Sequence, residues 1–155
     1  MGRTGAKDIS PYNVIPFLLS RQRAYISFIS ALRLYGIIEQ IPQAITIAST
    51  AHTRTISTKI GVFFIHRIMP EFFNGFNWYR GRGTGNFLIA EPEKALIDSL
   101  YLSVCKKKQF GHFPELYSPK TFSFKKAKNW AEKIPDARIA VSAQRKLKNI
   151  LHMYF

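Results

Sequence analysis

The sequence predicts an α+β fold, in which helices pack against a small, mostly antiparallel sheet and the C-terminal part is helical. Three observations support this prediction. Apolar residues recur with a helical period over 25–36 and after residue 92, they alternate as in strands between residues 45 and 68, and the helical pattern returns from about residue 124. The chain has 155 residues, of which 46% are apolar, which is enough for one hydrophobic core. We therefore expect a single domain over residues 1–155, with 1–9 as a flexible lead-in.

Helices are indicated by apolar residues three and four positions apart and by residues that favour helix ends. Ser27 is placed to cap a helix that ends at Gly36, where glycine adopts the left-handed conformation without strain. A further helix begins at Pro92, because proline suits the first turn. The other helices are expected near residues 11–19, 124–134 and 137–150.

Strands are indicated where β-branched and aromatic residues dominate, at 45–50, 54–58, 61–68 and 87–89. The second and third of these strands are expected to form a hairpin. Its turn contains Gly61, at a position that we expect to need a positive φ. The glycine-rich segment 74–86 is expected to be a surface loop.

Positive charge is the most pronounced property of the composition. The chain has 23 Lys and Arg against 9 Asp and Glu, a net charge of +14 at pH 7. A field of this sign attracts polyanions, so we expect nucleic acid as a partner, ahead of an acidic lipid surface or an acidic protein. The residues expected to contact it are Arg54, Lys59, Arg67, Arg80, Arg82, Lys106, Lys107 and Lys108.

Two aromatic residues, Trp78 and Tyr79, lie next to Arg80 and Arg82 in the glycine-rich segment. Exposed rings beside arginines suit stacking on an unpaired base while the arginines bind phosphate. Rings in a loop also close over a hydrophobic core. Both interpretations remain open at the level of sequence.

Few residues suggest catalysis. The four histidines lie far apart and Cys105 is the single cysteine, so no cofactor and no metal site are expected. Glu91, Glu93 and Asp98 form one close acidic group. Lys94 lies among them, which makes a metal-dependent nuclease or nucleotide-processing enzyme an alternative. Glu91 and Glu93, however, point in directions about 200° apart on a helix, and acids at a helix start also suit its dipole. We therefore do not expect an enzyme.

The sequence also indicates the compartment. No apolar stretch approaches the roughly 20 residues of a membrane helix, and the N-terminus has no hydrophobic segment of the signal-peptide kind. A single cysteine excludes an internal disulfide and fits a reducing environment. We expect a cytoplasmic protein without a membrane partner.

Three stretches of the chain resemble a known family. They are Tyr-Ile-Ser-Phe-Ile-Ser-Ala-Leu at 25–32 with Gly36, the hairpin at 55–68 and Ala-Glu-Pro-Glu-Lys-Ala-Leu-Ile-Asp at 90–98. Together they resemble the C-terminal domain of AbiEi-type antitoxins, from type IV toxin–antitoxin and abortive-infection systems. The resemblance covers about residues 20–105, and its most specific residues are Glu91, Pro92, Glu93, Lys94 and Asp98.

The resemblance implies a bacterial antitoxin and transcriptional regulator that acts against a nucleotidyltransferase-like toxin, in this family generally without a stable complex. Family members usually carry an N-terminal winged helix-turn-helix that binds operator DNA. Only about 24 residues precede the matched region, too few for a winged helix, so we expect either a truncated form or a stand-alone antitoxin-like domain. Residues 106–155 would then form a basic helical part. A protein-interaction module that docks through Trp78 and Tyr79 is a further alternative.

Overall fold

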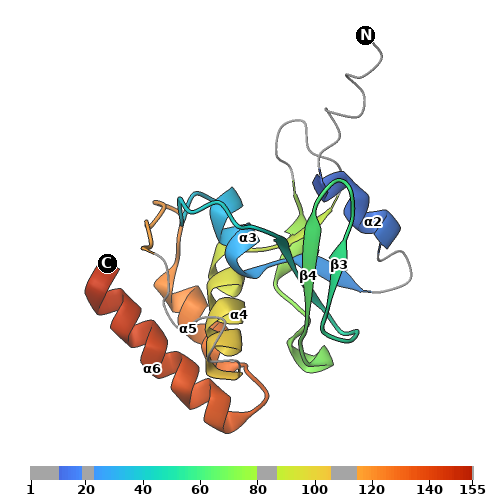
Figure 1. Ribbon diagram of the computed structural model, residues 1–155. Coiled ribbons are helices and arrows are strands. Elements are labelled where there is room, and N and C mark those ends of the chain that lie inside the picture. The colour runs from blue at the N-terminus through green and yellow to red at the C-terminus, as the bar shows by residue number, and fades with distance from the viewer. Residues whose placement is uncertain (1–10, 19–22, 80–86, 106–114, 155) are drawn as a thin grey trace.

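The computed structural model describes residues 11–18, 23–79, 87–105 and 115–154. Within this part of the chain, a six-stranded mixed sheet lies beside a group of helices, of which the last two are C-terminal (Figure 1). This arrangement confirms the α+β class. The expected lead-in and five of the expected nucleic-acid contacts lie outside the described residues: Arg80, Arg82, Lys106, Lys107 and Lys108.

The sheet has the strand order β3-β4-β2-β1-β6-β5, so that β3 and β5 form its edges. Antiparallel pairings join β1 to β2, β3 to β4 and β5 to β6, whereas β1 pairs in parallel with β6 and β2 with β4. The sheet is therefore mostly antiparallel, as expected. Its strands are β1 (Ala24–Ile26), β2 (Ile45–Ser49), β3 (Arg54–Ser57), β4 (Val62–Arg67), β5 (Phe76–Trp78) and β6 (Leu88–Ala90).

The helices α3, α5 and α6 are arranged around α4, which Figure 1 shows between the sheet and α6, whereas α2 lies beside the β3–β4 hairpin. Every residue of α4 from Glu93 to Ser103 is buried, because α3, α5, α6 and β6 all pack against it. The helices are α2 (Ile15–Leu18), α3 (Phe28–Leu34), α4 (Pro92–Cys105), α5 (Phe124–Glu132) and α6 (Ala137–Tyr154), with 3-10 turns at Pro11–Val14 (η1) and Pro70–Phe72 (η2).

The expected helix at 25–36 is shorter than its sequence pattern suggests. Residues 24–26 form β1 at the centre of the sheet, where hydrogen bonds to both β2 and β6 outweigh their weak helical preference. Ser27 precedes α3 as predicted, but its side chain makes no capping hydrogen bond. Gly36 ends the helix with a φ of 75°, as predicted.

The first residue of α3, Phe28, has a positive φ of 60°. This left-handed conformation costs a non-glycine residue roughly 1–2 kcal/mol. The Phe28 ring is completely buried and contacts the His66 ring edge-on, at 5.2 Å between ring centres. Burial of a phenylalanine side chain contributes about 1.5–3 kcal/mol, which offsets the backbone strain.

Two glycine expectations change in the structure. Gly61 does not have a positive φ, because Thr58 holds the hairpin turn: its hydroxyl oxygen accepts the N–H groups of Ile60 and Gly61, both at 3.1 Å. The segment 74–86 is not entirely a loop, since 76–78 form β5. The glycine that does need a positive φ is Gly75, with a φ of 80°, directly before that strand.

Gly75 also approaches other elements closely, which gives a testable difference from Gly36. A Cβ atom at Gly75 would lie 2.8 Å from both Lys94 Cγ and Trp130 Cζ2, whereas nothing lies within 4 Å of one at Gly36.

We expect Gly36→Ala to lower the free energy of unfolding by roughly 1 kcal/mol through backbone strain alone. Gly75→Ala should cost about 1–3 kcal/mol more, because overpacking adds to the strain. Urea unfolding followed by circular dichroism measures both, and equal losses would contradict the close approach.

Candidate nucleic-acid interface

Lys94 and Asp98 form a buried ion pair on α4. They are four residues apart and so share one side of the helix, with Lys94 Nζ 2.7 Å from Asp98 Oδ1 and both side chains fully buried. The Lys94 ammonium also donates to the Tyr25 hydroxyl and to the Phe72 carbonyl oxygen, each at 2.9 Å. All three N–H groups of the ammonium therefore have an acceptor.

The Asp98 carboxylate connects this pair to the sheet. Its Oδ2 accepts hydrogen bonds from the hydroxyls of Tyr25, at 2.9 Å, and Ser27, at 2.6 Å. Tyr25 lies in β1, and Ser27 is the first residue after that strand. The Asp98 carboxylate therefore holds α4 against β1, in the middle of the sheet. Burial, reinforced by the charge of Asp98, raises the pKa of Tyr25 well above its usual value and keeps this phenol a donor.

Aromatic rings enclose the Lys94 ammonium. Its Nζ lies 3.8 Å from the centre of the Phe72 ring and 5.5 Å from that of Trp130, distances at which a cation is attracted to a ring face. Burial lowers the pKa of Lys94, although the charge of Asp98 opposes the shift. The pair is closed off from solvent, and we assign it to the packing of α4 against β1 and η2.

The two glutamates of the same segment attach α5 to α4. Glu91 accepts a hydrogen bond from Trp130 Nε1 at 2.7 Å and a weaker one from Lys126 at 3.4 Å. Glu93, which is buried, accepts the backbone N–H of Ser123 at 2.7 Å, directly before α5. Pro92 is the first residue of α4, as predicted. The residues that carry the family resemblance therefore maintain the packing of α4.

This geometry also bears on the nuclease alternative. Glu91, Glu93 and Asp98 bind three different sets of partners instead of converging. Among the residues that the structure describes, no group of three or more His, Cys, Asp or Glu side chains could hold a metal ion. The acidic group that suggested this alternative therefore has a structural explanation.

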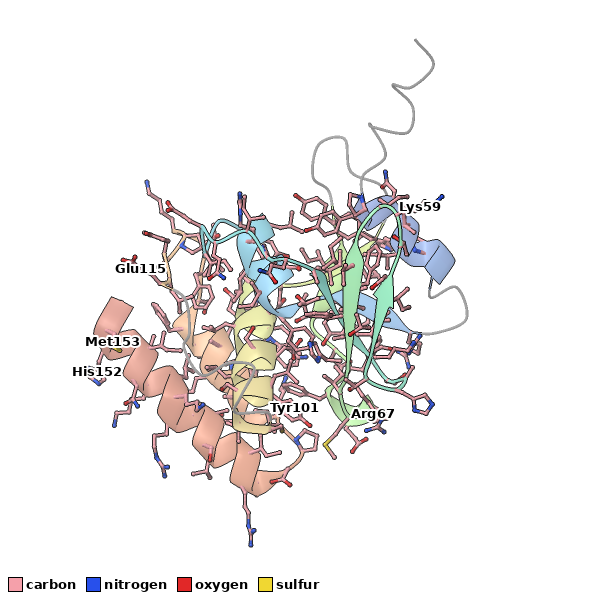
Figure 2. The ribbon with its side chains drawn as sticks, viewed as in Figure 1. Lys59, Arg67, Tyr101, Glu115, His152 and Met153 are labelled. Atoms are coloured by element: carbon pink, nitrogen blue, oxygen red, sulfur yellow. The ribbon has the colours of Figure 1, made fainter. Side chains whose placement is uncertain are left out.

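The hairpin cations do not form one cluster. Lys59 lies in the turn and Arg67 at the other end of β4, and Figure 2 shows them at opposite ends of the hairpin. Arg54 is half-buried, and its guanidinium donates to the carbonyl oxygen of His52 at 3.1 Å. Arg54 lies at the same end of the hairpin as Arg67, because it pairs with Ile65 on β4, so that only Lys59 is separated from the other two cations.

Trp78 and Tyr79 differ in their surroundings. Trp78 is 59% exposed on the edge strand β5, where it is open to a partner. Tyr79 is half-buried and stacks on Phe87, with 4.9 Å between ring centres, so it covers the core. Of the two interpretations, closure over the core therefore applies to Tyr79, and stacking of Trp78 on a base stays a prediction.

The described residues gather positive charge on α5 and α6, which were not among the expected contacts. Both helices bury small and aliphatic side chains, such as Ala127, Ala131, Ala143 and Leu147. Their solvent-exposed cations are Lys125, Lys126, Lys128, Arg138, Arg145 and Lys148. The acids Glu132 and Asp136 lie only near the turn between the helices, and Asp136 caps α6 by accepting two of its backbone N–H groups. We call this surface the α5–α6 face.

A groove runs along the α5–α6 face. Its volume is about 540 Å³, and it combines an apolar floor with a rim of ammonium groups. The sequence signal for this surface is the spacing of the cations, such as Lys125 with Lys128 and Arg145 with Lys148, which lie three positions apart and therefore on one side of each helix. The lining residues are Phe124, Lys125, Lys128, Gln144, Leu147, Lys148 and Leu151.

No model of a known protein family matches the chain, and neither does any curated protein. The antitoxin resemblance therefore rests on the residues quoted above. None of the helices in the described part of the chain combines the length and the apolar character needed to span a membrane.

The buried ion pair predicts a large difference between two lysine substitutions. Lys94→Met should lower the free energy of unfolding by about 3–5 kcal/mol, because it leaves the Asp98 carboxylate buried without its counter-ion. Lys126→Met removes the exposed pair with Glu91 and should cost less than about 1 kcal/mol. Adding Asp98→Leu to Lys94→Met should restore part of the loss. Thermal unfolding measures all three, and similar losses for the two single variants would refute this account.

Proposed function

We propose that the chain is an antitoxin-like regulatory protein of a type IV toxin–antitoxin system, acting in the bacterial cytoplasm, and that it contacts nucleic acid through the α5–α6 face. The observation that carries the nucleic-acid part is the separation of charge on this face. Cations occupy the exposed side along both helices, whereas the acids are confined to the turn region. Phosphate groups bind such a surface by releasing counter-ions, without any need for a specific sequence.

The antitoxin part of the proposal is supported by the resemblance over residues 20–105. The motif side chains Glu91, Glu93, Lys94 and Asp98 are engaged in holding α4. We therefore expect antitoxicity to depend on what this fold presents at its surface, and the motif to act by maintaining the fold. A basic surface is compatible with an antitoxin that acts without a stable complex with its toxin.

Protein binding is a second candidate function, favoured by the exposed ring of Trp78 on the edge strand β5. An edge strand offers unpaired backbone groups to a partner strand, and a tryptophan adds apolar contact area. Such binding would survive high salt, in contrast to a contact made mainly through phosphates.

Nucleic-acid binding by the α5–α6 face predicts a specific response to salt and to substitution. The association constant should fall steeply as the salt concentration rises. Replacing Lys125, Lys128 and Lys148 by Ala should reduce the steepness of log K against log salt by roughly 0.9 for each duplex phosphate that the protein no longer neutralises. A control variant, Lys59→Ala with Arg67→Ala, removes two exposed hairpin cations against the three of the test variant, and it should change the slope much less for each charge removed. Fluorescence anisotropy at several salt concentrations measures this. A larger effect of the hairpin variant would place the contact there.

Growth rescue tests the antitoxin part. A nucleotidyltransferase-like toxin encoded beside this chain should arrest growth when expressed alone, and co-expression of the chain should restore it. The triple lysine variant should fail to rescue if the α5–α6 face is needed, although it remains folded by circular dichroism. No rescue by the unaltered, folded chain would refute antitoxicity.

A further inference from the structure

We infer that the groove between α5 and α6 holds an unpaired base of a single-stranded nucleic acid, with its neighbouring phosphates on the lysine rim. This inference rests on the proposed function, because it specifies which nucleic acid the α5–α6 face binds. The groove, of about 540 Å³, is large enough to admit a base together with its sugar.

The floor of the groove suits the face of a base. Leu147 and Leu151 lie one helical turn apart on α6, about 6 Å along the axis, and Phe124 lies across from them on α5. Apolar and aromatic side chains bind bases of any sequence, because every base has an apolar π-face. Gln144 adds an amide that can both donate to and accept from the edge of a base.

The rim of the groove suits the backbone of a strand. Lys125 and Lys128 stand on the α5 side and Lys148 on the α6 side, and none of the described residues that line the groove is acidic. Each base within a strand is flanked by two phosphates, one on its 5′ side and one on its 3′ side. Ammonium groups on both sides of an apolar floor match this order of charges.

Two other polyanionic partners fit less well. In a duplex the bases are stacked and paired, so only phosphates would reach the rim and the apolar floor would stay unused. An acidic amphipathic helix usually docks through anchors at i, i+3 or i+4, and i+7, which span roughly 10 Å. The two leucines of the floor span only one turn, about 6 Å, so they offer contact for fewer anchors than such a helix presents.

The test compares three probes with the full chain by fluorescence anisotropy at low salt. They are a labelled oligothymidine strand of about twelve nucleotides, an abasic strand of the same length and charge, and a duplex. We expect the single strand to bind about five-fold or more tighter than the abasic strand or the duplex. Leu151→Ser should remove most of this preference and leave binding of the abasic strand unchanged.

Two further variants control the experiment. Val141→Ser makes the same kind of change at an exposed position of α6 outside the groove, and it should leave all three affinities unchanged. Gln144→Glu introduces a negative charge into the groove without removing apolar packing, and it should weaken the single strand several-fold. Thermal unfolding verifies that each variant is folded.

The outcomes separate the inference from the function on which it rests. Equal binding of the three probes, or a Leu151→Ser variant that keeps the preference for bases, overturns the inference and leaves the proposed function intact. Absence of binding to every probe overturns both. An acidic helical peptide with leucines three and four residues apart is the competitor. If Leu151→Ser abolishes binding of this peptide but leaves that of the strand unchanged, the groove is a protein site and the inference fails.

Discussion

The rest of the structure depends on the buried ion pair between Lys94 and Asp98. An ammonium group without water is tolerated only where acceptors surround it, and here they come from Asp98, Tyr25 and the backbone of Phe72. These residues belong to α4, β1 and η2, which lie far apart in the sequence. A displacement of any of these elements would leave a charge or a hydroxyl buried without a partner. The pair therefore specifies how the elements fit together, more than it adds to the free energy of folding.

The same helix positions the basic surface. Glu91 and Glu93 hold the start of α5 through Trp130 and the Ser123 backbone, and the Lys146 ammonium of α6 donates to Ser103 of α4 at 2.9 Å. Both C-terminal helices are thus tied to α4 by polar contacts as well as by apolar packing. These contacts hold the helix backbone that carries the lysines. The entropic cost of binding a ligand is lower on such a surface, because the helices need not be ordered at that moment.

The sequence predicts most of the fold, because α3, α4, α5 and the hairpin carry local signals such as Ser27, Gly36 and Pro92. It does not predict β1 or β5, because residues 24–26 continue the helical pattern of the segment that follows and residues 76–78 lie within a glycine-rich stretch that is typical of a loop. Composition alone suggests a basic interface, but charge does not say which cations lie together. Lys59 lies at the opposite end of the hairpin from Arg54 and Arg67, while the α5–α6 groove exists only once Phe124 and Leu151 are brought together by packing.

The central position of β1 has a consequence for synthesis on the ribosome. β1 precedes the other described strands in the sequence, yet its parallel partner β6 pairs through Ile89, and the Tyr25 hydroxyl donates to Asp98, 73 residues further along the chain. Until the chain has grown past α4, one side of β1 has unpaired backbone groups and the hydroxyls of Tyr25 and Ser27 lack their acceptor. The nascent protein must therefore pass through a stage in which this strand edge is unpaired. At this stage aggregation competes with folding, and it is favoured by a high protein concentration and opposed by chaperones.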